Sequence, residues 1–164
     1  MTDRTLSVAW EDPSALAMRA RETSGVDFLR AIVAGELPKA PIQELLGFSL
    51  TEVDPGRAVF TAVPGEQHYN PIGTVHAGLA ATLLDSAMGV AVHSTLELGE
   101  AYTTLETSFN LVRAVTAETG EIRCEGRILH RGGRVATAEG SVTRASDGKL
   151  VAHGKSTCLI IRAG

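Results

Sequence analysis

The fold is decided by the apolar stretch Ala77-Gly-Leu-Ala-Ala-Thr-Leu-Leu-Asp-Ser-Ala-Met-Gly-Val-Ala-Val92, which carries one formal charge, at Asp85. Its length and composition predict a buried helix over residues 76–93. A carboxylate is seldom fully buried unless another group pairs with it or donates hydrogen bonds to it. Asp85 is therefore the first candidate for a functional residue.

The composition indicates one globular domain. Of the 164 residues, 44% are hydrophobic and 21% charged, which is ordinary for a folded chain. A formal net charge of −4 and an aromatic content of 4% argue against nucleic-acid binding. The apolar stretch is too short to span a bilayer and the first residues lack a signal-peptide pattern, so we expect a cytoplasmic protein without membrane contact.

The two cysteines, Cys124 and Cys158, both lie in strand-like segments. They show no metal-ligand spacing with histidines or with each other, so no metal site is expected. We predict two buried free thiols, which is typical of a reducing compartment.

Outside the long helix, the pattern changes from helical to strand-like at Gly47. Two helices are expected within residues 13–35, broken at Gly25, and a short one at 41–46. Strands are expected at 48–53, 57–63, 102–112, 119–130, 134–144 and 149–161. Helices and strands segregate along the chain, so the fold class is α+β, with five or six antiparallel strands curled around the central helix. We expect residues 1–40 to form an N-terminal helical extension and residues 41–164 the main domain.

The strand at 102–112 alternates between apolar and polar residues. The alternation places Leu105, Phe109 and Leu111 on one face and Thr104 on the other.

The stretch Asn70-Pro-Ile-Gly-Thr-Val-His76-Ala-Gly-Leu-Ala-Ala-Thr-Leu-Leu-Asp85-Ser-Ala-Met-Gly89 resembles the signature of the hotdog-fold acyl-CoA thioesterases. It is most similar to the PaaI-like (phenylacetate-pathway) branch, which is related to one type of 4-hydroxybenzoyl-CoA thioesterase. The similarity covers roughly residues 25–161. Two departures stand out: His76-Ala77-Gly78 replaces the usual His-Gly-Gly, and Leu111-Val112-Arg113-Ala114 replaces a motif of the Phe-x-Arg-Pro type. The resemblance implies a hotdog fold and hydrolysis of an acyl- or aryl-CoA thioester to the free acid and CoA, without a cofactor.

The spacing of His76 and Asp85 indicates how such a site is assembled. Nine residues on a helix separate two side chains by about 13 Å and turn them to nearly opposite faces. They cannot serve one reacting atom within a protomer, whereas antiparallel pairing of two such helices about a twofold axis would bring them together. The spacing favours a homodimer with shared sites, which the resemblance also implies. Dimers are expected to pair into a tetramer.

The chemistry of thioester hydrolysis suggests a role for each candidate residue. The N–H of Ala77, at the helix start, would bind the developing oxyanion with help from Asn70. Ala77 keeps this donor, and would fail in place of glycine only if the position needs a positive φ or the methyl blocks the acyl group. His76 would orient the thioester or the loop. Asp85 would act as general base or nucleophile, and Thr104 aligns with the family residue that positions the water.

Gly78 and five further arginine and glycine positions are candidates for binding the substrate. Guanidinium and glycine N–H groups suit phosphates, and the resemblance places CoA near Arg113 and the hairpin Arg131-Gly132-Gly133-Arg134. Tyr69, Leu79, Leu83 and Met88 are expected to line the acyl pocket. Two other functions stay open: hydration or dehydration of an enoyl thioester, and non-catalytic acyl-CoA binding.

Overall fold

The computed structural model describes residues 3–162, which form four helices, two short 3-10 turns and six strands. In chain order they are α1 (Pro13–Glu22), α2 (Gly25–Val33), α3 (Pro41–Leu46), β1 (Phe48–Asp54), β2 (Arg57–Ala62), η1 (Glu66–His68), α4 (Ala77–His93), β3 (Glu100–Leu111), η2 (Ala117–Thr119), β4 (Ile122–Arg131), β5 (Val135–Arg144) and β6 (Leu150–Arg162). The predicted order and approximate bounds of the elements are confirmed, and so is the α+β class.

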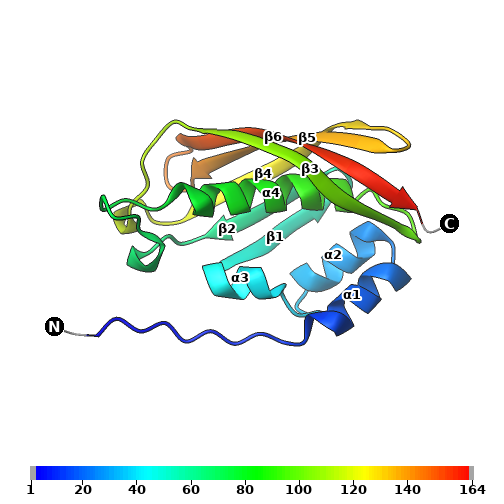
Figure 1. Ribbon diagram of the computed structural model, residues 1–164, viewed down its shortest axis with the longest axis horizontal. Helices are drawn as coiled ribbons and strands as arrows, with labels where there is room; N and C mark the ends of the chain where they lie inside the picture. Colours follow the sequence, from blue (N-terminus) through cyan, green and yellow to red (C-terminus); the bar gives the residue numbers. More distant parts are fainter. Residues whose placement is uncertain (1–2, 163–164) are drawn as a thin grey trace.

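The six strands form one antiparallel sheet in the order β1-β2-β4-β5-β6-β3. The sheet curls around α4, and helices α1–α3 lie beyond β1 (Figure 1). Nine residues of α4 are buried in the resulting core, among them Leu83, Leu84 and Met88. Among the described residues, the helices are too short or too polar to cross a membrane. Cys124 and Cys158 are buried free thiols, as predicted.

Two glycines of a row across the sheet, Gly126 and Gly140, let α4 lie directly on the sheet. Gly126, Gly140 and Gly154 stand opposite one another on β4, β5 and β6. A methyl group on Gly126 would lie 2.3 Å from the backbone C and O of Ala87, in the middle of α4. One on Gly140 would lie 3.0 Å from Met88 Cγ. Helix and sheet therefore meet backbone to backbone at Gly126, which fixes the depth of α4 in the core.

Gly126→Ala is expected to lower the free energy of unfolding by roughly 3 kcal/mol, because overpacking here must move helix backbone and not only a side chain. Chemical denaturation of the purified protein measures the change. Gly133→Ala is the matched control, since a methyl group there meets no atom within 4 Å. Equal denaturation midpoints for the two variants would contradict this packing.

The predicted alternation of the strand at 102–112 is wrong. The register of β3 against β6 shifts between Thr104 and Glu106, because Leu105 is an extra, bulged residue. Beyond the bulge, the faces exchange. Thr104 pairs with Cys158, and Thr107 with Ser156, which puts both threonines on the side of α4 together with Phe109 and Leu111. Leu105 is 59% exposed.

The N-terminal helices are joined to the core at the end of α4. The ring of Phe28 in α2 stacks on the ring of His93 at a centroid distance of 5.4 Å, and the ring of Tyr102 lies tilted against the same imidazole at 5.7 Å. The Gly25 N–H donates to the Leu96 carbonyl at 3.0 Å. This burial lowers the pKa of His93 to about 4.

Acidification is expected to weaken the fold through His93. The unfolded chain binds a proton at this histidine near pH 6.5 and the folded chain only near pH 4, so stability is full above about 6.5 and is lost as the pH falls toward 4. The whole loss is on the order of 3 kcal/mol. Denaturation of wild type and His93→Gln at several pH values measures it, with exposed His153→Gln as control. The prediction fails if His93→Gln keeps the wild-type dependence on pH between 4 and 6.5.

Candidate functional site

The first turn of α4 is closed by His76. This residue is the N-cap, and its Nδ1 accepts a hydrogen bond from the Gly78 N–H at 2.8 Å. The ring proton therefore resides on Nε2. A methyl group on Gly78 would lie 2.9 Å from Nδ1, so glycine leaves room for the cap. Because its N–H is bound to His76, Gly78 does not offer that donor to a substrate in this structure.

Ala77, the first residue of α4, has a negative φ, since positive φ values among the described residues occur only at glycines. The position usually held by glycine therefore needs no glycine for its backbone. Among residues 3–162, the N–H of Ala77 makes no hydrogen bond, whereas those of Gly78 and Leu79 are both taken up by His76.

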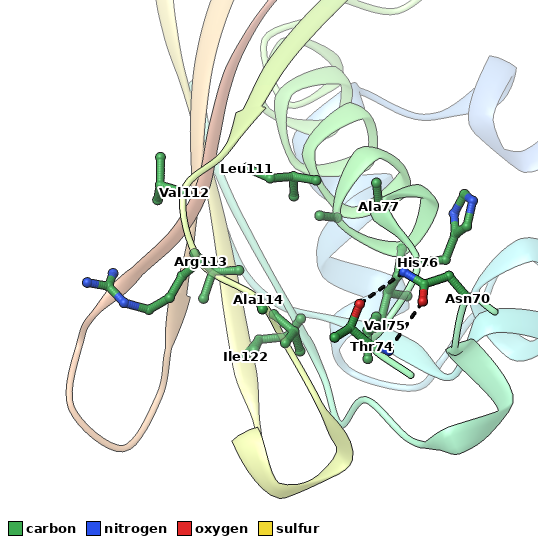
Figure 2. Close-up of a pocket in the computed structure, with 14 residues that line it drawn as sticks. Asn70, Thr74, Val75, His76, Ala77, Leu111, Val112, Arg113, Ala114 and Ile122 are labelled. Carbon is green, nitrogen blue, oxygen red and sulfur yellow. Dashed lines mark hydrogen bonds between the residues drawn. The ribbon is translucent and has the colours of Figure 1, made fainter. Parts of the chain in front are cut away.

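The loop before α4 is held by Asn70. Its Oδ1 accepts from the N–H groups of Ile72 and Thr74 at 3.0 and 3.2 Å, and its Nδ2 donates to Thr74 Oγ1 at 3.0 Å. Figure 2 shows the last two bonds. The Asn70 amide thus shapes the loop, and its predicted help to an oxyanion would use only the second N–H of Nδ2.

A cleft of about 390 Å³ opens beside this helix end. It brings together the predicted residues Asn70, His76, Ala77 and Arg113. The remaining lining is mostly apolar and comes from the loop before α4, from α4 itself, from the end of β3 and the segment after it, and from the neighbouring strands: Thr74, Val75, Leu79, Ala80, Leu111, Val112, Ala114, Val115, Ile122 and Val151. The Arg113 side chain extends away from Asn70 (Figure 2) and donates to the Leu150 carbonyl at 2.5 Å.

The structure places the residues predicted to line the acyl pocket in different surroundings. Leu79 lies in the cleft, and Tyr69 lines a smaller adjoining hollow with His76. Leu83 and Met88 are fully buried, so they pack the core under the sheet. Because this segment is apolar on all sides, its sequence does not show which helix face is buried in the core and which face lines the cleft.

Asp85 is exposed, contrary to the expectation of a buried helix carrying a sequestered acid. The rest of the chain covers the side of α4 that holds Asp85 and Ala81 only in part. Two threonine hydroxyls of β3 reach the carboxylate: Thr104 Oγ1 lies 3.2 Å and Thr107 Oγ1 3.0 Å from Oδ1. The structure therefore brings predicted Thr104 to Asp85 and adds Thr107, which was not among the predicted site residues.

The structure does not bring Asp85 to His76 within one protomer. Both lie on α4, nine residues apart, which corresponds to about 13 Å along the axis. Asp85 is not among the residues that line the cleft beside His76.

The predicted CoA-binding residues are also separated. Ile122, at the start of β4, lines the cleft, whereas Arg131 ends β4, about 30 Å farther along the strand. Arg131 pairs with Glu100 at 2.6 Å, and Glu100 also pairs with Arg162 at 3.0 Å. Burial alone would raise the pKa of Glu100, but hydrogen bonds from the Glu97 N–H and the two arginines lower it. Gly132, Gly133 and Arg134 form the turn beside this cluster.

No group of three histidine, cysteine, aspartate or glutamate side chains within residues 3–162 is placed to hold a metal ion.

An antiparallel sheet curled around one central helix, with a cleft at the start of that helix, is the architecture of the hotdog fold. The similarity of this chain to known proteins agrees with that assignment. The sequence profile of the thioesterase superfamily matches residues 72–151. Human acyl-coenzyme A thioesterase 13 is 30% identical over 137 residues, which cover 82% of this chain and 96% of that protein.

Solved structures give the same result. A putative thioesterase from Ralstonia eutropha, a phenylacetic acid degradation-related protein, is 30% identical with a TM-score of 0.71, covering 80% of this chain and 98% of that one. A conserved protein from Pseudomonas aeruginosa is 32% identical with a TM-score of 0.69, covering 75% and 95%. The chain belongs to the thioesterase superfamily and is a thioester hydrolase of the hotdog fold, which confirms the predicted family and enzyme class.

Proposed function

We propose that this protein hydrolyses acyl-CoA thioesters, with Asp85 activating the attack and the Ala77 N–H stabilising the oxyanion. The observation that carries the proposal is the Asp85 carboxylate held by two threonine hydroxyls on the open side of α4. The names of its relatives support CoA as the thiol: one is an acyl-coenzyme A thioesterase and another is related to phenylacetic acid degradation.

The orientation of the Asp85 carboxylate suits attack on a carbonyl. Both threonines bind Oδ1, so Oδ2 can face a water molecule. As general base, Asp85 takes a proton while the water oxygen bonds to the thioester carbon. The C–S bond then breaks, and the proton passes to the CoA sulfur. As nucleophile, Asp85 bonds to the carbon itself, CoA thiolate leaves, and water cleaves the resulting anhydride. Water is the only co-reactant in either route.

The start of α4 supplies the complementary positive charge. The Ala77 N–H lies at the N-terminal end of α4, where the helix macrodipole is positive, and no described residue accepts a hydrogen bond from it. An oxyanion there would gain a hydrogen bond that the substrate carbonyl makes less strongly.

We propose that the site is completed by a second copy of the chain. Strand β3 is an edge of the sheet, so one side of its backbone has free hydrogen-bonding groups. Phe109 and Leu111, on the α4 side of this strand, are 36% and 48% exposed, and Leu105 at the bulge is 59% exposed. Antiparallel pairing at β3 would cover these side chains and bring the Asp85 of one copy to the His76 of the other.

The arginine hairpin fits the same assembly. Arg131 lies far from the cleft that contains Arg113 in the same chain, so Arg131–Arg134 can contact CoA phosphates only at the cleft of another copy. A dimer of dimers would supply that contact.

We also propose a cytoplasmic location. The two free cysteines of the protein are consistent with a reducing compartment.

Asp85→Asn is expected to lower kcat/KM about 100-fold or more, because the amide can neither accept the proton nor attack. The measurement is release of CoA thiol from short-chain, long-chain and aromatic CoA esters. Glu106→Gln, which removes an exposed acid from β3, the strand whose threonines contact Asp85, should keep wild-type activity. Full activity of Asp85→Asn would refute the mechanism. Hydration of crotonyl-CoA without thiol release, or binding without turnover, would favour the two other functions.

Mixing two inactive variants is expected to restore activity if sites are shared. Asn70→Ala/His76→Ala disables the loop half and Asp85→Asn the acid half. After unfolding and refolding together in equal amounts, half of the dimers are mixed and each has one intact site of two. Thiol release should therefore reach about a quarter of the wild-type rate. Each variant refolded alone is the control, and no gain on mixing would place both halves of the site in one protomer.

A further inference from the structure

We propose that Thr107 and Ser156 act together as positioning residues for Asp85: Thr107 aims the carboxylate, and Ser156 accepts the Thr107 hydrogen bond instead when Asp85 becomes neutral. The proposal rests on the proposed function for its catalytic meaning. It concerns residues outside the cleft and outside the predicted site, and it follows from the hydrogen bonds behind Asp85.

Three hydroxyl and carbonyl contacts form a chain from the exposed carboxylate into the core. Thr107 Oγ1 lies 3.0 Å from Asp85 Oδ1 and 3.3 Å from Ser156 Oγ. Ser156 Oγ donates in turn to the backbone carbonyl of Glu106 at 3.0 Å. Ser156 is 3% exposed, so water does not readily replace its partners.

The bulge at Leu105 makes this chain possible. Thr104 and Thr107 are three residues apart, and a regular strand would turn them to opposite faces. The extra residue puts both hydroxyls on the side of α4, and it leaves Thr107 directly opposite Ser156 across the β3–β6 ladder. Bulges of this kind redirect side chains next to functional groups.

Counting protons assigns the direction of each bond. Every hydroxyl has one proton to donate. The Ser156 proton is taken by the Glu106 carbonyl, so the Thr107 proton must choose between Asp85 Oδ1 and Ser156 Oγ. An ionised carboxylate is the stronger acceptor, and the proton goes to Asp85. The stiff β-branched side chain of Thr107 then fixes the direction of the carboxylate.

Neutral Asp85 reverses that choice. The carboxyl becomes neutral when it takes a proton from water, and equally when it forms an anhydride. Its Oδ1 is then a weaker acceptor, and rotation about the Thr107 C–O bond moves the hydroxyl proton to Ser156 Oγ. No proton changes residue in this step. Thr107 thus favours the ionised carboxyl and Ser156 the neutral one, so the pair limits how far a donated hydrogen bond weakens the base.

The other titratable groups near Asp85 stay neutral in the working range. Burial, and after it the charges of Cys158 and Asp85, raises the pKa of Tyr102 on β3. Burial also raises the pKa of Cys158 on β6, with a smaller contribution from Asp85, although hydrogen bonds with Ser156 and Thr104 lower it. His93, farther along α4, has a pKa lowered to about 4 by burial. The charged side chains of Glu106 and Lys155 occupy the opposite face of the sheet in the β3–β6 register.

The experiment compares the acidic midpoint of the kcat/KM profile, and the midpoint of the Asp85 carboxyl titration followed by carbon-13 NMR, in three variants. Thr107→Val removes the donor and is expected to raise both midpoints by about 0.5–1 pH unit and to lower kcat/KM about tenfold. Ser156→Ala removes the second acceptor and is expected to lower both by about 0.3 unit. Thr107→Ser keeps the hydroxyl and should restore wild-type midpoints.

Opposite shifts of the midpoints in Thr107→Val and Ser156→Ala support the proposed change of hydrogen-bond acceptor at Thr107. Shifts in the same direction, or lower activity with unmoved midpoints, overturn it, because a merely structural role predicts those results. Thr107→Ala replaces Thr107→Val if the latter does not fold. The NMR titration needs no turnover. A wild-type protein that releases no thiol would therefore refute the proposed function, and the NMR midpoints of the variants would still test the change of hydrogen-bond acceptor at Thr107.

Discussion

The close contact between α4 and β4 is the constraint on which the rest of the structure depends. At Gly126 the sheet has no side chain, and the backbone of Ala87 occupies that space. This sets how far the helix sinks into the curl of the sheet. Asp85, two residues before Ala87, is thereby held level with β3, where the hydroxyls of Thr104 and Thr107 reach it. A helix lying one side-chain layer higher would leave those contacts unmade.

Much of this architecture follows from pattern. An apolar segment of helical length between strand-like segments predicts a helix wrapped by a sheet, and turns such as Asp54-Pro55-Gly56 mark the hairpins. The family resemblance then singles out the loop before the helix. The predicted residues of that loop and of the helix start, Asn70, His76 and Ala77, do meet in one cleft with Arg113.

What the pattern could not supply depends on single-residue shifts and on distance. An alternating strand gives no sign that Leu105 is bulged, so the pattern put Leu105 on one face with Phe109 and Leu111 and did not point to Thr107 as a neighbour of Asp85. Leu83, Met88 and Asp85 lie in one segment that is apolar on every side, and only the curvature of the sheet decides which of them stays uncovered. The separation of Arg113 from Arg131 similarly follows from the length of β4, which composition does not reveal.

The exposure of Asp85 in one chain has a physical advantage for the proposed assembly. A single chain folds with the carboxylate solvated, so folding bears no large desolvation cost for an unpaired acid. In the proposed dimer the same carboxylate would lose water only when a second copy and a substrate cover it, and the lower dielectric would then strengthen its interaction with the developing charges. Hydroxyls that can satisfy both the ionised and the neutral carboxyl fit this sequence of events, because the group must be stable in each.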